Sequence, residues 1–364
     1  MVKRNGTMRT LVLSLTIALS IAFGAVFLAA CGNNGDRPNE DTVEFTDSCN
    51  RVVTVPANIT KVAVSGPLAQ QILITFKPEV LVGLATEIDP EVDKYIEIDL
   101  SSLPVYGQIY GGKGTVNKEA LAAAQPDVII DLGEAKNTIV EDMDDLQQTL
   151  GIPCVHIECG LDSYGQAYTL LGTLLGERER ASLMAAYCTN AYQSVANAMA
   201  NVLPANRFRA AYVVNTAGLA VLAKGSYQAG VIDMVMNNVA VVDNPSSKGT
   251  GNAVDIEQLA LWNPDLLIVG SAELLEEFST NPAWRAIPAV VNGRYIFAPV
   301  EPYNWMGMPP SVAQLMGIQW LAHVFYPEKF SDTLKECVTG YYELFYQYQL
   351  SDAEYNTLMA NSTR

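Results

Sequence analysis

The chain has 364 residues, of which 49% are hydrophobic, and its formal net charge is −17. This length exceeds what one hydrophobic core usually supports, and the hydrophobic content excludes a largely disordered chain, so the sequence predicts two globular domains. The acidic balance argues against a nucleic-acid partner and against electrostatic attachment to anionic lipids, because both require a basic surface.

Residues 1–30 predict a secretory signal. Three basic residues precede an apolar run from Leu11 to Ala30 that ends in Leu28-Ala29-Ala30-Cys31. Small residues before a cleavage site are typical of such signals. The tetrapeptide resembles a bacterial lipobox, which implies that Cys31 becomes a lipidated mature N-terminus; the alternative is an uncleaved anchor helix. Residues 31–42 are polar and suit a flexible tether, so we expect an extracytoplasmic body held at the bacterial cell membrane.

The first half of the body alternates short apolar runs with helical patterns. Residues 43–55 predict a β-hairpin, because two β-rich runs flank a polar turn. Strand–helix alternation predicts right-handed βαβ units and a parallel sheet. The expected strands are Lys61–Ser65, Val80–Leu84, Asp127–Asp131 and Val155–Glu158.

One long helix is expected between two such α/β segments. From Glu177 to Leu203 there is no Gly or Pro, and apolar residues recur at steps of three and four. The predicted buried stripe is Leu183, Met184, Tyr187, Ala191, Val195, Met199 and Val202. We interpret this helix as a strut between two lobes; the alternative is a core helix of one large domain.

The second half repeats the alternation and ends in helices. Its expected strands are Ala210–Val214, Val239–Val242, Leu266–Val269 and Tyr295–Ala298, followed by helices over residues 311–325 and 332–349. Glu119–Asp131 reads EALAAAQPDVIID and Glu257–Gly270 reads EQLALWNPDLLIVG. The shared order of helix, Pro-Asp and apolar strand indicates a weak internal repeat.

Several phrases, in their order and spacing, resemble the extracytoplasmic solute-binding proteins of ABC importers for ferric siderophores, haem and cobalamin. These phrases are LAAAQPDVIID, LQQTLGIPCVHIE, DIEQLALWNPDLLIV and the closing stretch from Tyr303 to Phe330. The resemblance implies an α/β fold with two Rossmann-like lobes, parallel sheets and a single long backbone helix. The corresponding domains are residues 43–162 and 204–330 for the lobes, 163–203 for a short helix and the linker helix, and 331–364 for a C-terminal helical segment.

Ligands of open parallel sheets bind beyond the carboxyl ends of the strands. That rule selects Ser65-Gly66-Pro67, residues 106–115, Gly133-Glu134, residues 216–227, residues 246–252, Gly270-Ser271 and residues 301–308. Aromatic surface with a few polar anchors suits a large chelate. The candidate ligand-binding residues are therefore Tyr106, Tyr110, Lys113, Tyr227, Tyr303, Asn304, Trp305 and Met308. For Trp305, packing beneath the last helices is the alternative.

Only two histidines, His156 and His323, are present, and both are expected to be packed in the interior. A site rich in imidazole therefore cannot form, so we expect no bound metal ion and no intrinsic cofactor, and a preassembled metal complex as ligand: a ferric siderophore, haem or a corrinoid. Five cysteines follow Cys31, so at least one thiol stays free or pairs with another chain, and buried free thiols are expected although the compartment could permit disulfides. No CxxC is present, so a zinc or redox site is not expected.

The resemblance also implies an ABC permease with its ATPase as partners, and a monomeric binding protein. Glu87 in the first lobe and Asp243 in the second are the candidate docking acids, although the second region lacks the glutamate that is usual in the family. The alternatives are a binding protein for another metal complex and a surface lipoprotein without a transport role. An enzyme is disfavoured, because the chain has no GxGxxG after its first strand, no GxSxG and no HExxH.

Overall fold

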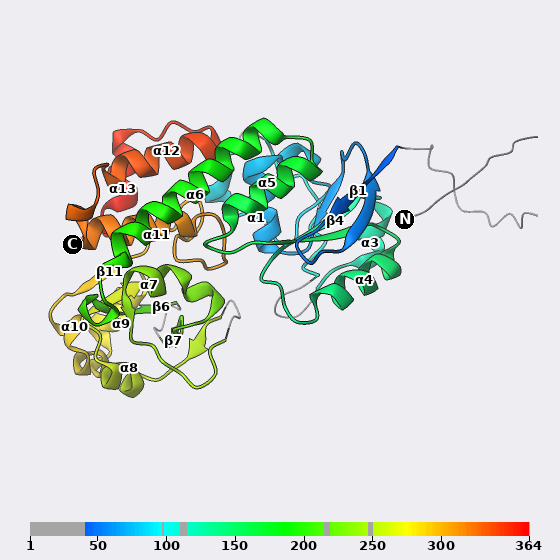
Figure 1. Cartoon of the computed structure of the whole chain (residues 1–364). Coiled ribbons are helices and arrows are strands. Elements are labelled where there is room, and N and C mark those ends of the chain that lie inside the picture. The colour runs from blue at the N-terminus through cyan, green and yellow to red at the C-terminus, as the bar shows by residue number, and fades with distance from the viewer. Residues whose placement is uncertain (1–40, 97, 110–114, 215–218, 247–249, 364) are drawn as a thin grey trace, which may run out of the picture. The chain divides into compact units, whose positions relative to one another are not determined.

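A computed structural model describes residues 41–96, 98–109, 115–214, 219–246 and 250–363 (Figure 1). The chain divides into two units, Met1–Asn39 and Glu40–Arg364, and all described residues belong to the second. The predicted signal, Cys31 and most of the tether lie outside the described residues, as do Tyr110 and Lys113. No helix within the described ranges is long and apolar enough to cross a membrane.

The described part begins with the predicted hairpin. Strands β1 (Thr42–Thr46) and β2 (Val52–Pro56) pair antiparallel, and Phe45 lies opposite Val53. The turn between them depends on Asp47, whose carboxylate accepts the backbone N–H groups of Cys49 and Arg51 at 2.9 and 3.0 Å. This is how short acidic side chains usually stabilise turns.

Three parallel strands form the N-terminal sheet, with β4 in the middle. The first five of the six residues of β4 are buried, as an apolar strand covered on both faces requires. The strands are β3 (Val62–Val64), β4 (Val128–Gly133) and β5 (Cys154–Glu158), and the helices before and between them are α1 (Pro67–Phe76), α2 (Pro90–Asp93), α3 (Lys118–Ala123) and α4 (Ile139–Leu150). The predicted strand Val80–Leu84 is wrong: a 3₁₀ turn occupies Pro78–Val80, and only Leu81 and Leu84 make isolated bridges.

Helices α5 (Tyr164–Leu174) and α6 (Arg178–Ala200) follow this sheet. The 23 residues of α6 agree with the long helix predicted from the sequence, and α6 packs against α5, α7 and α11. Its buried residues are Ala181, Met184, Cys188, Ala191, Val195 and Met199. Leu183 was predicted to be in this stripe, but its side chain is 60% exposed.

The C-terminal sheet contains parallel strands at its centre and short antiparallel strands at one edge. Strand β6 (Arg209–Val213) pairs parallel with β8 (Asn237–Asn238) and β10 (Leu266–Val269), and β10 pairs parallel with β11 (Tyr295–Phe297). Strands β7 (Ala220–Val221) and β9 (Asn252–Ala253) are antiparallel. The predicted strand Val239–Val242 is replaced by the two-residue β8 just before it. The helices here are α7 (Gly230–Val235), α8 (Ile256–Trp262), α9 (Leu274–Thr280) and α10 (Pro288–Val291).

The internal repeat predicted from the two Pro-Asp phrases is confirmed in the backbone. Helices α3 and α8 each begin at a side-chain cap, Asn117 or Asp255, and in each phrase the residue before the proline, Gln125 or Asn263, is left-handed. The aspartate after each proline then makes an equivalent backbone hydrogen bond. The N–H of Asp127 donates to the carbonyl of Lys61, just before β3, and the N–H of Asp265 donates to the carbonyl of Arg209 in β6. Both phrases therefore place a helix, a tight turn and a central strand at equivalent positions.

Three helices complete the chain: α11 (Gln314–Phe325), α12 (Leu334–Tyr346) and α13 (Asp352–Met359). Thr333 and Glu336 form a capping box at the start of α12, and Ser351 and Glu354 form another at α13. Sequence reasoning missed α13, although Ser351-x-x-Glu354 is a recognisable start signal for a helix. Helix α11 is largely buried between α6, α7 and α12.

Candidate ligand-binding cleft

A cavity of about 380 Å³ opens at the carboxyl ends of the N-terminal strands. One wall follows β3 and β4, at Ser65–Leu68 and Asp131–Glu134, and also includes the first turn of α4. The opposite wall comes from segments after α6, at Tyr227, Gln228, Ser246 and Pro310. Among the segments selected by the rule that ligands bind beyond strand ends, Ser65-Gly66-Pro67, Gly133-Glu134 and the start of the segment at Ser246 line this cavity.

The floor of the cavity is a buried chain of polar side chains. The Ser65 hydroxyl donates to one oxygen of Asp131, and the other oxygen lies 2.7 Å from Nδ1 of His156. His156 is fully buried, as predicted, and its backbone N–H donates to Asp47. Because the Ser65 hydroxyl already donates its hydrogen bond to Asp131, its oxygen can only accept hydrogen bonds from a ligand.

Helix α1 begins at the same cavity, since both Pro67 and Leu68 line it. The first turn contains no acidic side chain, and Gly66 supplies no side-chain cap. The partial positive charge of the helix N-terminus is therefore not offset by a carboxylate within its own first turn. The cavity thus combines acceptor groups at Ser65 and Asp131 with a nearby region that favours negative charge.

Tyr227 is the predicted site residue that the structure places in this cavity. Its hydroxyl donates to the backbone carbonyl of Cys159, just after β5, so it links the segment after α6 to the N-terminal sheet. Burial raises the pKa of Tyr227 well above its usual value, with smaller contributions from nearby acidic groups. The residue is therefore a neutral phenol in the protein, which disfavours a role as a ready-made phenolate ligand for ferric iron.

The aromatic loop at residues 301–308, which the sequence predicted to contact the ligand, does not line this cavity. Trp305 is fully buried and its indole N–H donates to the Glu301 carbonyl at 3.1 Å. Asn304 is also engaged internally, because its amide donates to the Tyr212 hydroxyl at 3.0 Å. Tyr303 and Met308 are partly buried against the core of the molecule. The alternative of packing beneath the last helices was therefore the right one for Trp305.

Tyr106 lies near the cavity without lining it. Its ring lies so close to Gly83 that a Cβ there would be 2.3 Å from a ring carbon, which accounts for the glycine. A little farther along, the Ile109 N–H donates to the Ser65 carbonyl at 2.7 Å. The segment that leads to Tyr110 and Lys113 therefore runs beside the cavity floor.

Glu301 makes a polar contact that sequence reasoning missed. Its carboxylate accepts from Lys94 and from the Tyr95 hydroxyl, each at 2.7 Å, although these residues lie more than 200 positions earlier. Burial opposes ionisation of Glu301, but these hydrogen bonds lower its pKa below the usual value. Burial and the bond to Glu301 together raise the pKa of Tyr95 to about 12. The contact ties the loop before α11 to the segment after α2.

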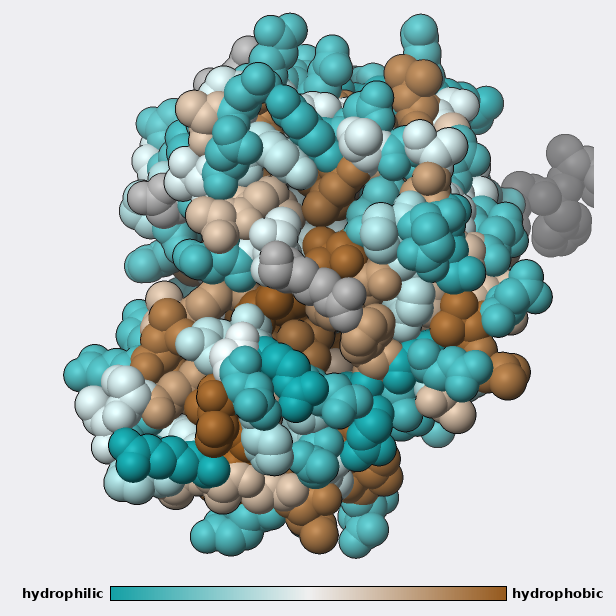
Figure 2. Space-filling view, turned by 90° about the vertical axis from the view of Figure 1, so that its left-hand side faces the viewer, coloured by the Kyte–Doolittle hydropathy of each residue, from teal (hydrophilic) through white to brown (hydrophobic). Residues whose placement is uncertain are grey.

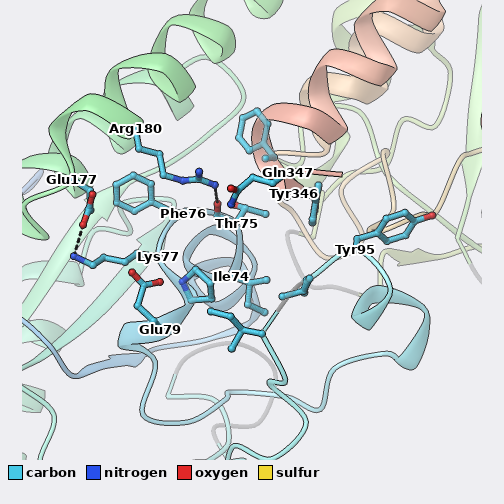
Figure 3. A pocket seen from close by; sticks show the side chains of 14 residues that line it. Ile74, Thr75, Phe76, Lys77, Glu79, Tyr95, Glu177, Arg180, Tyr346 and Gln347 are labelled. Carbon is cyan, nitrogen blue, oxygen red and sulfur yellow. Dashed lines mark hydrogen bonds and ion pairs between the residues drawn. The ribbon is translucent and has the colours of Figure 1, made fainter. Parts of the chain in front are cut away.

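Two other cavities lie away from the carboxyl ends of the strands. One, of about 220 Å³, is where the C-terminal end of α1 meets the start of α6 (Figure 3). There Lys77 pairs with Glu177 at 2.8 Å, and Arg180 donates to the Thr75 carbonyl at 2.8 Å. These bonds fix the first turn of α6 against α1. They give the cavity a structural role.

The third cavity, of about 580 Å³, lies at the amino ends of β10 and β11, where Phe208 and Phe325 line it with Leu266 and Tyr295. The side of the molecule that carries β11 shows hydrophobic side chains around a hollow, on an otherwise mostly hydrophilic face (Figure 2). Because this is the amino edge of the sheet, the strand-end rule does not select it. The cavity of about 380 Å³ is therefore the candidate ligand site.

The chain belongs to the periplasmic binding protein family, which it matches over residues 89–302, more than half of its length. The molybdate-binding protein MolA of Haemophilus influenzae is 24% identical over 332 residues, which cover 83% of this chain and 90% of MolA. The solved structure of molybdate-bound MolA has a TM-score of 0.67, with 21% identity, and covers 85% of this chain and 99% of that one.

Other solved structures share the fold. A solute-binding protein of an ABC transporter from Sulfurospirillum deleyianum is 23% identical, with a TM-score of 0.79, over 87% of this chain and 99% of that one. A periplasmic solute-binding protein from Veillonella parvula is 25% identical, with a TM-score of 0.68, over 88% and 98%. Named ligands of further similar structures include a catecholate siderophore for VctP of Vibrio cholerae (TM-score 0.52, 16% identity) and nickel for CeuE of Helicobacter pylori (0.62, 15%).

The chain is therefore an extracytoplasmic solute-binding protein of the periplasmic binding protein family, and it is not an enzyme. The family match and the position of the cavity support each other, since both point to capture of a solute beyond the strand ends.

Proposed function

We propose that this protein captures a metal complex in the cavity of about 380 Å³ and delivers it to the permease of an ABC importer. The observation that carries the proposal is that residues before and after α6 line one cavity at the carboxyl ends of parallel strands. Its volume falls in the range of roughly 300–1,000 Å³ that suits compact organic ligands. A bare metal ion would fill little of this volume, and water would occupy the rest.

We also propose that residues 43–162 and 204–330 act as two lobes and that α6 is the rigid linker between them. The 23 residues of α6 span roughly 35 Å at 1.5 Å per residue. Packing against α5 and α11 stiffens the helix further. A helix held in this way allows small closing movements. The hydrogen bond from the Tyr227 hydroxyl to the Cys159 carbonyl is a natural pivot, because it links the segment after α6 to the N-terminal sheet.

The chemistry of the floor supports a complex over a simple oxyanion. Ser65 and Asp131 present acceptor atoms, which would repel the oxygens of an anion such as the molybdate that MolA binds. The N-terminus of α1, which lies beside these two residues, instead favours negative charge. A ligand with a positive or proton-donating part and an anionic part satisfies both. Ferric siderophores, haem and corrinoids are such ligands.

A molybdate-like oxyanion is the second candidate, favoured by the similarity to MolA and by the N-terminus of α1, whose first turn contains no acidic side chain. The third is a surface lipoprotein without a transport role. Anchoring through a lipid on Cys31 and docking through Glu87 and Asp243 also remain proposals. Both acids are exposed, as a docking role requires. We further propose that the protein acts as a monomer.

Calorimetric titration of a soluble form that begins after Cys31 tests the assignment, because this form keeps the whole compact unit Glu40–Arg364. The ligands are ferric siderophores of several classes, haemin, cobalamin and sodium molybdate. Saturable binding of one chelate, with none of molybdate, supports the proposal. Binding of molybdate alone selects the oxyanion, and no binding by the folded protein favours the surface lipoprotein.

The place of binding is tested with Ser246→Trp, which adds bulk to the rim of the cavity without disturbing the buried floor. We expect it to weaken binding by at least tenfold. Ser279→Trp is the matched control, because Ser279 is exposed on α9 and lies outside the cavity lining. Equal affinity of the Ser246→Trp and wild-type proteins, with both folded, would remove this cavity from the binding site.

A further inference from the structure

Three potential metal ligands of different chemical types meet beside the C-terminal helices, outside the cavity described above. His323 lies in the last turn of α11, Asp332 in the connection to α12, and Cys337 in the first turns of α12. Sγ of Cys337 lies 3.2 Å from an oxygen of Asp332 and 3.9 Å from Nε2 of His323. The second oxygen of Asp332 lies 3.6 Å from the same Nε2.

These separations match a tetrahedral metal site. Bonds of about 2.0–2.3 Å at tetrahedral angles place the ligand atoms about 3.3–3.7 Å from one another. The sulfur of Cys337 and Nε2 of His323 are 3.9 Å apart, and each lies 3.2 or 3.6 Å from a different oxygen of Asp332. A rotation of the partly exposed Asp332 carboxylate, which brings one oxygen toward both atoms, would complete the geometry.

The imidazole of His323 is already oriented for such a role. Its Nδ1 lies 2.8 Å from the Gln319 carbonyl, which can only accept, so Nδ1 carries the proton and Nε2 of the neutral ring has a free lone pair. The ring is also stacked on Phe330, with centroids 4.1 Å apart. Histidine ligands of metals commonly donate their second N–H to a carbonyl in this way, since that bond fixes the ring.

We propose that His323, Asp332 and Cys337 bind one Zn²⁺ ion through Nε2, a carboxylate oxygen and the thiolate, with water in the fourth position. A nitrogen, sulfur and oxygen donor set suits Zn²⁺ and related divalent ions, whereas Mg²⁺ and Ca²⁺ prefer oxygen alone. The expectation that His323 is only a packed residue is therefore incomplete. The arrangement depends on two helices and their connection, which no spacing in the sequence displays.

Binding exchanges one proton for the metal. In the metal-free protein the Cys337 thiol donates a hydrogen bond to an oxygen of Asp332 at 3.2 Å, so the sulfur carries its proton there. When the S–Zn bond forms, the S–H bond breaks and the proton passes to solvent through Asp332, whose side chain is 49% exposed. The ion would join the end of α11 to the start of α12 and stabilise the connection between them.

The test uses Co²⁺ as a spectroscopic substitute for Zn²⁺, with the chelator-treated soluble form that begins after Cys31. We expect one Co²⁺ per chain, a thiolate-to-cobalt charge-transfer band, and displacement of Co²⁺ by Zn²⁺. Titration of Zn²⁺ in two buffers with different ionisation enthalpies should show release of about one proton per ion. A wild-type protein that shows no thiolate band overturns the proposal.

Variants locate the site. Cys337→Ser should abolish the band, and Asp332→Asn should weaken Zn²⁺ binding at least tenfold. Asp332 is exposed, so the Asp332→Asn protein is expected to fold even if removal of the buried thiol disturbs α12. Cys49→Ser is the control, because Cys49 is a partly exposed free thiol on the β1–β2 turn. If Asp332→Asn binds Zn²⁺ as tightly as wild type, or Cys49→Ser alone loses the band, the assignment is wrong.

Discussion

Replacement of Trp305 by alanine distinguishes a core residue from a ligand contact. Trp305 is among the largest side chains that are completely buried, and its backbone carbonyl approaches Gly317 of α11 so closely that a Cβ there would be 2.1 Å away. The loop at residues 301–308 is therefore clamped beneath α11. We expect Trp305→Ala to lower the stability of the protein while leaving the affinity of the folded protein for its ligand unchanged.

The magnitude follows from the contacts that are lost. Truncation of a buried aromatic side chain to alanine typically costs about 3–5 kcal/mol. The lost indole hydrogen bond adds little, because the Glu301 carbonyl also accepts from the Tyr342 hydroxyl at 2.7 Å and keeps a partner. We therefore expect a loss of about 4 kcal/mol, a large share of the roughly 5–15 kcal/mol that stabilises most proteins.

Urea unfolding followed by circular dichroism measures this loss as a lower midpoint at an unchanged slope. Ligand titration at low temperature, without urea, measures binding by the folded variant. Trp262→Ala is the control: Trp262 ends α8 and is partly exposed, so its truncation should cost clearly less. A Trp305→Ala protein of normal stability whose affinity falls tenfold or more would refute the packing argument and return the loop to the site.

Three further predictions concern anchoring, pH and docking. Cys31→Ser should release the protein from membranes without changing ligand affinity, and continued retention in the membrane fraction would contradict a lipid anchor. The pKa of Glu301 is lower in the folded protein than its unfolded-state value of about 4.3. The contact of Glu301 with Lys94 therefore stabilises the fold fully above about pH 4.3, and this stabilisation is lost as the pH falls through the folded-state pKa. Because both groups are partly exposed, Glu301→Gln should cost only about 0–1 kcal/mol at pH 7 and less at pH 3, measured by urea unfolding; an equal cost at both pH values would count against the ionic contact. Glu87→Lys with Asp243→Lys should reduce uptake by intact cells at least tenfold at unchanged affinity, and normal uptake would place docking elsewhere.

Periodicity and turn chemistry predicted most of the elements that position the cavity. The apolar run of β4, the spacing along α6 and the two Pro-Asp phrases are local patterns, so they were legible before the fold was known. The strand-end rule then selected Ser65-Gly66-Pro67 and Gly133-Glu134, which line the cavity. The expected strand Val80–Leu84 failed because its apolar residues fill the core from a 3₁₀ turn and irregular backbone, which have no period of their own.

Composition alone did not decide whether the loop at residues 301–308 is packed or exposed to a ligand. The loop from Glu301 to Met308 combines aromatic and polar residues, which is equally typical of a binding loop and of a loop packed beneath helices. Only the position of α11 decided between them, because Gly317 admits the Trp305 backbone there. Asp131 carried a clearer signal: a carboxylate within an otherwise apolar strand needs partners, and it finds them in Ser65 and His156.

The amino-acid sequence by itself determined the α/β class, the alternation of strands and helices and the place of the long helix, because these depend on contacts between near neighbours in the chain. Tertiary structure alone decided which side chains face the cavity, since its walls come from residues more than 150 positions apart, such as Ser65 and Tyr227. The same holds for the contact of Lys94 with Glu301 and for the cluster of His323, Asp332 and Cys337. A side chain's partners across a fold depend on how helices and sheets pack, and no local pattern records that packing.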